Sequence, residues 1–167
     1  MGPVVSRLSD YSNDRRQQRK DFIMNEILRF ESIDHITLIV SDINKTRHFY
    51  CDILGMAQVP RPEFDFDGLW LHPCQPSPGE TVRALIHATL ESDLAGKAGW
   101  GDRKVKSLSR GHHFAFEVND AIEACEHLRS KGVNIVVEPR RRPDGPTQFY
   151  IRDPDDHVIE IFSLANE

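Results

Sequence analysis

Apolar and polar residues follow the same plan in two stretches of this chain. Residues 33–40 are rich in isoleucine, with Leu38 and Val40, which predicts a buried strand. Asp42 follows as a helix N-cap, and the apolar positions after it recur at helical spacing as far as Gly55, a residue suited to closing a helix. Residues 112–118 and the cap Asp120 repeat this order, so the chain contains two copies of a strand followed by a capped helix.

Further apolar runs predict three more strands in each half. Turns rich in Pro, Gly and Asp separate these runs, which are residues 56–60, 68–72, 81–90, 133–138, 147–152 and 157–163. Each half therefore has the order β-α-β-β-β, and its one helix can cover only one face of its sheet. We expect an α+β fold in which two βαβββ modules form a cupped mixed sheet, lined by the strand faces turned away from the helices.

Shifts in composition divide the chain into four segments. Residues 1–31 are mostly polar, and we interpret them as a partly disordered N-terminal extension with a short lead-in helix at 22–30. The first module is expected to span residues 32–92 and the second residues 111–164. Residues 93–110 are polar and contain glycine, which predicts a linker between the modules.

Bulk composition narrows the classes of function. The formal net charge of −5 argues against a general nucleic-acid binder, because such proteins need a basic surface. No apolar run approaches the ~18 residues that a membrane span requires, and the chain does not open with the pattern of a secretory signal. The 3 cysteines are odd in number and not closely spaced, which argues against a disulfide framework. We therefore expect a cytoplasmic protein that binds neither membranes nor nucleic acid.

A pair of histidines occupies equivalent places in the two halves. When residues 34–53 are laid over residues 112–131 without gaps, His35 falls on His113. Strand alternation places both imidazoles on the face opposite the bulkier apolar side chains. Because those bulkier side chains are the better candidates for packing on the helices, both histidines should face the cup.

His87 and Glu160 form a second pair, each inside an apolar strand late in its half. An imidazole or a carboxylate with apolar neighbours is costly to bury unless it is paired or binds a metal. Imidazole nitrogen and carboxylate oxygen suit borderline divalent cations. Together with His35 and His113, this pair predicts a cup built around one divalent metal ion, which is Zn, Ni, Fe, Co or Mn.

Three sequence runs resemble the vicinal oxygen chelate superfamily, which includes glyoxalase I, extradiol dioxygenases, fosfomycin-resistance thiol transferases and bleomycin-binding proteins. They are IDHITLIVSDINKTRHFYCDILGM, GHHFAFEV and FYIRDPDDHVIEIF, and the resemblance covers about residues 32–164. Carried over position by position, it implies that the metal ligands are His35, His87, His113 and Glu160. The chain departs from the family pattern at Asp156, where the turn usually has glycine.

The resemblance implies that two oxygens of a small substrate bind an open metal position, which stabilises an enediolate. Glu160 would double as the catalytic base. A complete set of four ligands favours a glyoxalase-type lyase or isomerase. If His87 does not bind, the remaining two histidines and one carboxylate would suit an Fe(II) ring-cleaving dioxygenase. A fosfomycin-type thiol transferase and a metal-free binding protein of the bleomycin-resistance type remain alternatives.

Substrate contacts are expected from both halves. Thr37 and Tyr150 resemble positions that contact fosfomycin in the thiol transferases. Arg140 and Arg142 lie in a loop that could cover an anionic substrate, or that could simply be solvated. Trp70 could be a pocket wall or part of the core, and the core is the slightly favoured interpretation. We expect a homodimer, because exposed sheet edges associate readily and some members of the superfamily build the metal site across subunits.

Overall fold

The computed structural model describes residues 32–99 and 111–164. The described residues from Asp34 onward belong to one compact unit. The lead-in helix expected at 22–30 and part of the expected linker lie outside the described residues. Within the described ranges, no helix is long and apolar enough to cross a membrane.

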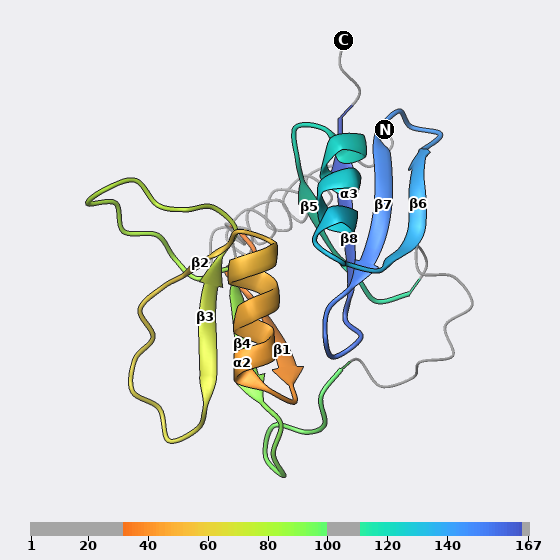
Figure 1. Cartoon of the computed structure of the whole chain (residues 1–167). Helices are drawn as coiled ribbons and strands as arrows, with labels where there is room; N and C mark the ends of the chain where they lie inside the picture. The colour runs from red at the N-terminus through yellow and green to blue at the C-terminus, as the bar shows by residue number, and fades with distance from the viewer. Residues whose placement is uncertain (1–31, 100–110, 165–167) are drawn as a thin grey trace, which may run out of the picture. The chain divides into compact units, whose positions relative to one another are not determined.

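The first half is a four-stranded sheet with a helix on one face (Figure 1). Its elements in chain order are β1 (Ile36–Val40), α2 (Ile43–Arg47), the π-helical continuation η1 (His48–Ile53), β2 (Ala57–Gln58), β3 (Gly68–His72) and β4 (Ile86–Leu90). The strand order is β1-β4-β3-β2, and only the β1–β4 pair is parallel. Strand β1 therefore lies at one edge of this sheet.

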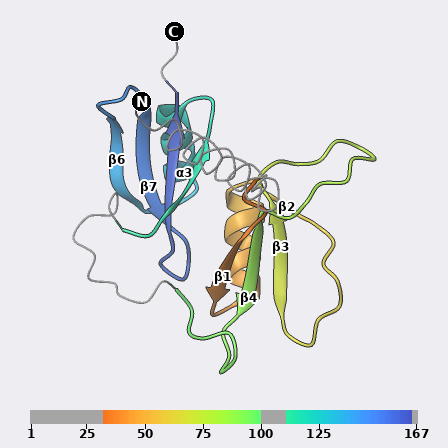
Figure 2. The same ribbon diagram turned by 180° about the vertical axis from the view of Figure 1, so that it is seen from behind.

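The second half repeats this arrangement (Figure 2). Its elements are β5 (Phe114–Glu117), α3 (Ala121–Ser130), β6 (Ile135–Arg141), β7 (Thr147–Arg152) and β8 (Val158–Ser163). The strand order is β5-β8-β7-β6, with β5 and β8 parallel. The predicted α+β class with two βαβββ modules is confirmed, and the strands of the described residues form two sheets rather than one continuous sheet.

Capping explains where both helices begin and end. The Asp42 carboxylate accepts from the backbone N–H groups of Asn44 and Lys45, the second and third residues of α2, at 2.9 and 3.0 Å. Asp120 caps α3 in the same way, at 2.7 and 3.1 Å. Gly55 and Gly132 follow the helices with φ of +75° and +80°, a left-handed conformation that glycine adopts without strain.

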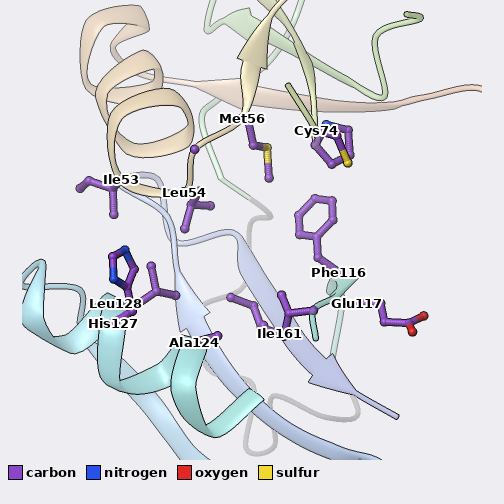
Figure 3. Close-up of a pocket in the computed structure, with 13 residues that line it drawn as sticks. Ile53, Leu54, Met56, Cys74, Phe116, Glu117, Ala124, His127, Leu128 and Ile161 are labelled. Carbon is purple, nitrogen blue, oxygen red and sulfur yellow. The ribbon is translucent and has the colours of Figure 1, made fainter. Parts of the chain in front are cut away.

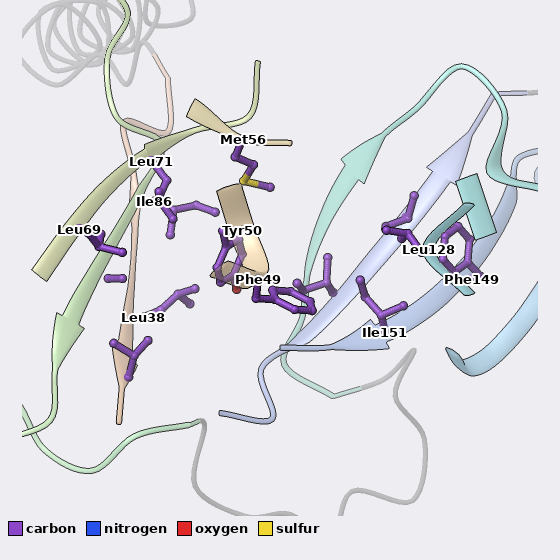
Figure 4. Packing of buried hydrophobic residues seen from close by; sticks show 14 of the residues in the cluster. Leu38, Phe49, Tyr50, Met56, Leu69, Leu71, Ile86, Leu128, Phe149 and Ile151 are labelled. Atoms are coloured by element: carbon purple, nitrogen blue, oxygen red, sulfur yellow. The ribbon is translucent and has the colours of Figure 1, made fainter. Parts of the chain in front are cut away.

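One hydrophobic core collects the helix-facing side chains of both halves (Figure 4). Leu38 and Val40 of β1 are buried in it, whereas Thr37, which precedes Leu38, is exposed and Ile39, which lies between the two, is only partly buried. Phe114 and Phe116 of β5 pack against the same core. The alternation predicted from the sequence is therefore correct, and it leaves the opposite strand faces available for a site.

A buried polar network joins the first half to the turn before β8. The Tyr50 hydroxyl donates to Asp153 Oδ2 at 2.9 Å, and the Ser41 backbone N–H and hydroxyl both donate to Asp155. His157 contributes its backbone N–H and its Nδ1 to Asp153, each at 2.8 Å. Asp156 adopts φ of +67° in this turn, which is why glycine would be the usual residue there.

Candidate functional site

The first group of candidate ligands lies on the open face of the β1–β4 sheet. His35 immediately precedes β1, and its ring stacks on that of His87 in β4, with ring centroids 3.9 Å apart and planes inclined by 16°. Trp70 lies opposite His87 in the neighbouring strand β3 and stacks on the other side, at 4.4 Å and 9°. The indole therefore borders the first half-site and also packs against a small apolar cluster of Ala57, Val59 and Ala84, so it has features of both sequence interpretations.

Hydrogen bonding orients the His35 imidazole. Its Nδ1 lies 2.8 Å from the Asp34 carboxylate, and this contact is the main reason that the pKa of Asp34 is lowered. Arg83 holds the same carboxylate from the other side. A histidine that donates Nδ1–H to a carboxylate presents its Nε2 lone pair outward, which is the usual arrangement of a metal-binding histidine.

The environment of His87 favours its neutral form. Partial burial lowers the pKa of His87, and the neighbouring His35 lowers it further. A metal binds the neutral imidazole, so a lowered pKa leaves more of this side chain ready to bind at neutral pH. Both members of the first pair thus offer a nitrogen ligand.

The second group of candidate ligands, His113 and Glu160, is built around the buried carboxylate of Glu160. Glu160 in β8 is 5% exposed, and Tyr150 lies opposite it in β7. The Tyr150 hydroxyl donates to Glu160 Oε2 at 2.8 Å, while His113 Nε2 lies 3.2 Å from the same oxygen. Arg142 Nη1 reaches within 3.5 Å of the other carboxylate oxygen.

The contact between His113 and Glu160 is satisfied by a proton or a cation between the two side chains. His113 Nδ1 lies 3.0 Å from the Gly111 carbonyl, which accepts only, so Nδ1 must carry a proton. In a neutral ring, Nε2 would then turn a lone pair toward the carboxylate at 3.2 Å. Two acceptors at that distance repel each other unless a proton or a cation lies between them, so this donor set fits a divalent metal ion.

Tyr150 serves this site as a hydrogen-bond donor. Burial, with a smaller contribution from its hydrogen bond to Glu160, raises the pKa of Tyr150 to about 12. The phenol therefore stays protonated at neutral pH and keeps one carboxylate oxygen oriented. Arg142 is also held, because Asp144 accepts two hydrogen bonds from its guanidinium at 2.9 and 2.5 Å.

The remaining predicted substrate contacts are less enclosed. Thr37 is exposed on β1 directly beside His87 in the β1–β4 register. Arg140 is exposed on β6, opposite Gln148. Both lie on elements that border a half-site, but neither contacts a candidate ligand in the interactions described above.

The four predicted ligands form two pairs rather than one cluster. Across residues 32–99 and 111–164, no three His, Cys, Asp or Glu side chains lie close enough together to hold a metal ion. The physical reason is the sheet arrangement: each pair sits on its own sheet, and strands of the two sheets are not hydrogen-bonded to each other. The expected cup with four ligands around one ion is therefore not formed by these described residues of a single chain.

An apolar pocket of about 350 Å³ lies elsewhere, and its lining contains none of the predicted ligands (Figure 3). Residues at the end of η1, in β5, in α3 and in β8 form its walls. Cys74 lines it as well. The candidate chemistry therefore lies on the open sheet faces and not in this pocket.

Sequence reasoning overlooked two features of the site. Asp34, which orients His35, directly precedes it in the chain and could have been recognised as a partner for that reason. The aromatic contacts of Trp70 could not, because they depend on the register between β3 and β4. Registers of this kind are set by long-range pairing rather than by local pattern.

A protein-family model, the Glyoxalase/Bleomycin resistance protein/Dioxygenase superfamily, matches residues 32–161. The chain belongs to this superfamily, in agreement with the resemblance seen in its sequence. Among named relatives, the "Probable lactoylglutathione lyase" of Synechocystis sp. is 30% identical over 137 residues, covering 80% of this chain and 95% of that protein. The lactoylglutathione lyase of Escherichia coli O157:H7 is 29% identical over 131 residues, covering 76% and 88%.

Solved structures show the same fold. A member of the superfamily from Sphaerobacter thermophilus matches with a TM-score of 0.57 at 21% identity, covering 81% of this chain and 99% of that chain. The fosfomycin resistance protein FosX from Listeria monocytogenes matches with a TM-score of 0.56 at 22% identity, covering 80% and 93%. At these identities the likeness concerns the fold alone.

Proposed function

We propose that this protein is a glyoxalase-type lyase or isomerase that depends on a divalent metal and acts on a small substrate with two vicinal oxygens. The observation that carries the proposal is the His113–Glu160 contact, where an imidazole with a fixed Nδ1–H faces a buried carboxylate at 3.2 Å. A divalent cation bound by both side chains would satisfy that geometry. The lactoylglutathione lyases among the relatives support the reaction class.

His35, His87, His113 and Glu160 would hold the ion. When bound, a divalent metal supplies Lewis acidity that polarises substrate oxygens. Glu160 is the group that moves a proton between substrate carbon and oxygen, because it is a buried carboxylate with one oxygen held by Tyr150. Arg142, within 3.5 Å of Glu160, is placed to bind an anionic group of the substrate.

Two copies of the chain would complete the site. Each ligand pair lies beside an edge strand, since His35 leads into β1 and His113 into β5. An edge strand offers unpaired backbone groups to another chain. In a twofold-symmetric homodimer, His35 and His87 of one subunit would meet His113 and Glu160 of the other, which gives two equivalent sites.

Mixing two inactive variants tests this arrangement. His87→Ala removes a ligand from the first pair, and Glu160→Gln removes one from the second. If sites form between subunits, unfolding and refolding the mixture restores about one quarter of the wild-type sites, because about half the dimers are hybrids and each hybrid has one intact site. Activity with the hemithioacetal of methylglyoxal and glutathione is the readout, together with metal content.

His48→Ala is the matched control. His48 is an exposed histidine that contacts Asp52, and among the interactions described it contacts none of the four candidate ligands. It should retain full metal content and activity. Failure of the mixture to regain any activity, with both variants folded, would contradict the shared site. Absence of metal from wild type after reconstitution would contradict the proposed enzyme and leave a small-molecule binding protein.

Metal content of His87→Ala separates the reaction classes. Loss of the ion supports a four-ligand lyase or isomerase. Iron retained in both wild type and variant would instead indicate the two-histidine, one-carboxylate site of an Fe(II) dioxygenase. Fosfomycin is the second substrate to assay, because Thr37 lies beside His87 and Tyr150 contacts Glu160.

A further inference from the structure

A row of aromatic rings continues outward from the first ligand pair. Trp70 stacks on His87 with ring centroids 4.4 Å apart. The Phe64 ring lies 6.2 Å from Trp70, and the Phe66 ring stacks on Phe64 at 5.2 Å. These spacings are those of interacting aromatic pairs, so the rings form one connected surface that ends at a candidate ligand.

The outer rings of this row are exposed. Phe64 and Phe66 are each 46% exposed, whereas Phe49 and Phe149 in the core are 8% and 0% exposed. Aromatic rings that only pack in the hydrophobic core are buried, as Phe49 and Phe149 are. The exposure therefore leaves apolar ring surface available to a ligand next to His87.

Arg61 holds the two exposed rings in place. Its guanidinium carbon lies 4.7 Å from the Phe64 ring centroid and 4.8 Å from that of Phe66. Its Nη2 donates to the Phe66 carbonyl at 2.7 Å. A Cβ on Gly68 would approach the Ala88 carbonyl oxygen to 2.5 Å, so this glycine lets the loop enter β3 close against β4. The ring surface is thus built into the sheet.

We propose that Phe64, Phe66 and Trp70 form a subsite that binds a planar aromatic group of the substrate that carries no negative charge. This inference rests on the proposed function, because the subsite adjoins the His35–His87 pair that would hold the metal. The substrate class is accordingly a molecule with two vicinal oxygens and an aryl substituent beside them.

Charge in the loop disfavours an acidic ring substituent. Glu63, Asp65 and Asp67 alternate with the two phenylalanines and are exposed, and Arg61 is the single cation of residues 61–67. A ring that carries a carboxylate would be repelled at short range, whereas a neutral ring would not. A protein partner is also disfavoured, because two half-exposed rings supply far less than the ~1,200 Å² of a stable interface.

Two chelators that differ by a ring test the subsite by calorimetric titration of the metal-loaded protein. Benzohydroxamate and acetohydroxamate offer the same two vicinal oxygens, and only the first carries an aryl group. We expect the preference for benzohydroxamate in wild type to exceed that of the Phe64→Ala/Phe66→Ala variant by about tenfold, or about 1.4 kcal/mol. Acetohydroxamate should bind both proteins with Kd values within about twofold of each other. Ile122→Ala removes a similarly exposed apolar side chain from α3 and should behave as wild type.

An equal preference for benzohydroxamate in wild type and the double variant would overturn the subsite. If neither hydroxamate binds, the chelating site of the proposed function fails, and the subsite is judged by benzamide, which has the ring without two vicinal oxygens. A benzamide-dependent NMR shift of the Trp70 indole N–H, assigned with Trp70→Phe and lost in the double variant, supports the subsite. Absence of that shift in wild type overturns the subsite. This outcome includes the case in which a second copy of the chain covers the rings and leaves no room for a ligand.

Discussion

Replacing Tyr50 by Phe removes one hydroxyl from the buried network that joins the two halves. The Tyr50 side chain is fully buried, and its hydroxyl donates to Asp153 Oδ2 at 2.9 Å. Burial, and then the nearby Asp153, raise the pKa of Tyr50 well above its usual value, so the hydroxyl is a donor at all ordinary pH values. The substitution keeps the ring and its packing, and it deletes only the hydrogen bond.

The expected loss follows from what the Asp153 carboxylate retains. A hydrogen bond to a charged group contributes about 1.5–3 kcal/mol. Asp153 still accepts from the backbone N–H groups of Asp155 and His157 and from His157 Nδ1, so it is not left without donors. We therefore expect the free energy of unfolding to fall by about 2 kcal/mol rather than by the larger penalty of an unpaired buried charge.

Urea unfolding at one fixed protein concentration measures this loss. Asp52→Asn is the control, because it breaks a histidine–carboxylate contact of similar length, 2.9 Å, in which both side chains are about half exposed or more. Exposed pairs of this kind contribute about 0–1 kcal/mol. A Tyr50→Phe loss no larger than that of Asp52→Asn would refute the view that the network stabilises the contact between the halves.

Three further predictions concern the site itself. Tyr150→Phe should abolish a loss of stability that wild type shows at alkaline pH. Because the pKa of Tyr150 is raised to about 12 from 10.0, the contribution of its hydroxyl to the free energy of unfolding is present below about pH 10 and is lost as the pH rises toward 12. Urea unfolding of wild type and variant across that pH range measures the difference. Asp34→Asn should weaken metal affinity by about 10–100-fold, since it replaces the charged partner of His35 Nδ1 by a neutral amide; competition with a chromophoric chelator measures this, and unchanged affinity would contradict the orienting role. Arg142→Ala should raise KM for an anionic substrate by about tenfold with little change in kcat, as expected when an ion pair to the bound substrate is lost; an unchanged KM in steady-state kinetics would show that Arg142 does not bind the substrate.

Local pattern predicted most of the elements. The expected strands at 68–72 and 147–152 have the observed bounds of β3 and β7, and both capping aspartates act as predicted. The expected strand at 56–60 is reduced to β2, which ends before Pro60, a residue without an N–H to donate. Caps and alternation depend on neighbours in the chain, which is why they can be read from the sequence.

The candidate site was predicted only in part. Internal repetition identified the four candidate ligands, because it matches His35 with His113 and places His87 and Glu160 late in their halves. It could not show that His35 and His87 adjoin one sheet while His113 and Glu160 adjoin the other, since that depends on which strands pair with which. The stacking of the aromatic row could not be predicted for the same reason, although the sequence marked Trp70 as a possible pocket wall: its phenylalanines come from the loop before β3, Trp70 comes from β3, and His87 comes from β4.

The separation of the ligand pairs onto two sheets has a thermodynamic consequence. In the proposed dimer, metal occupancy and subunit association are linked equilibria, so each must strengthen the other by the same free energy. Dilution would release the ion from an otherwise intact chain, and chelation would promote dissociation into folded subunits. The protein would then acquire its catalytic centre only above a threshold concentration of its own chains.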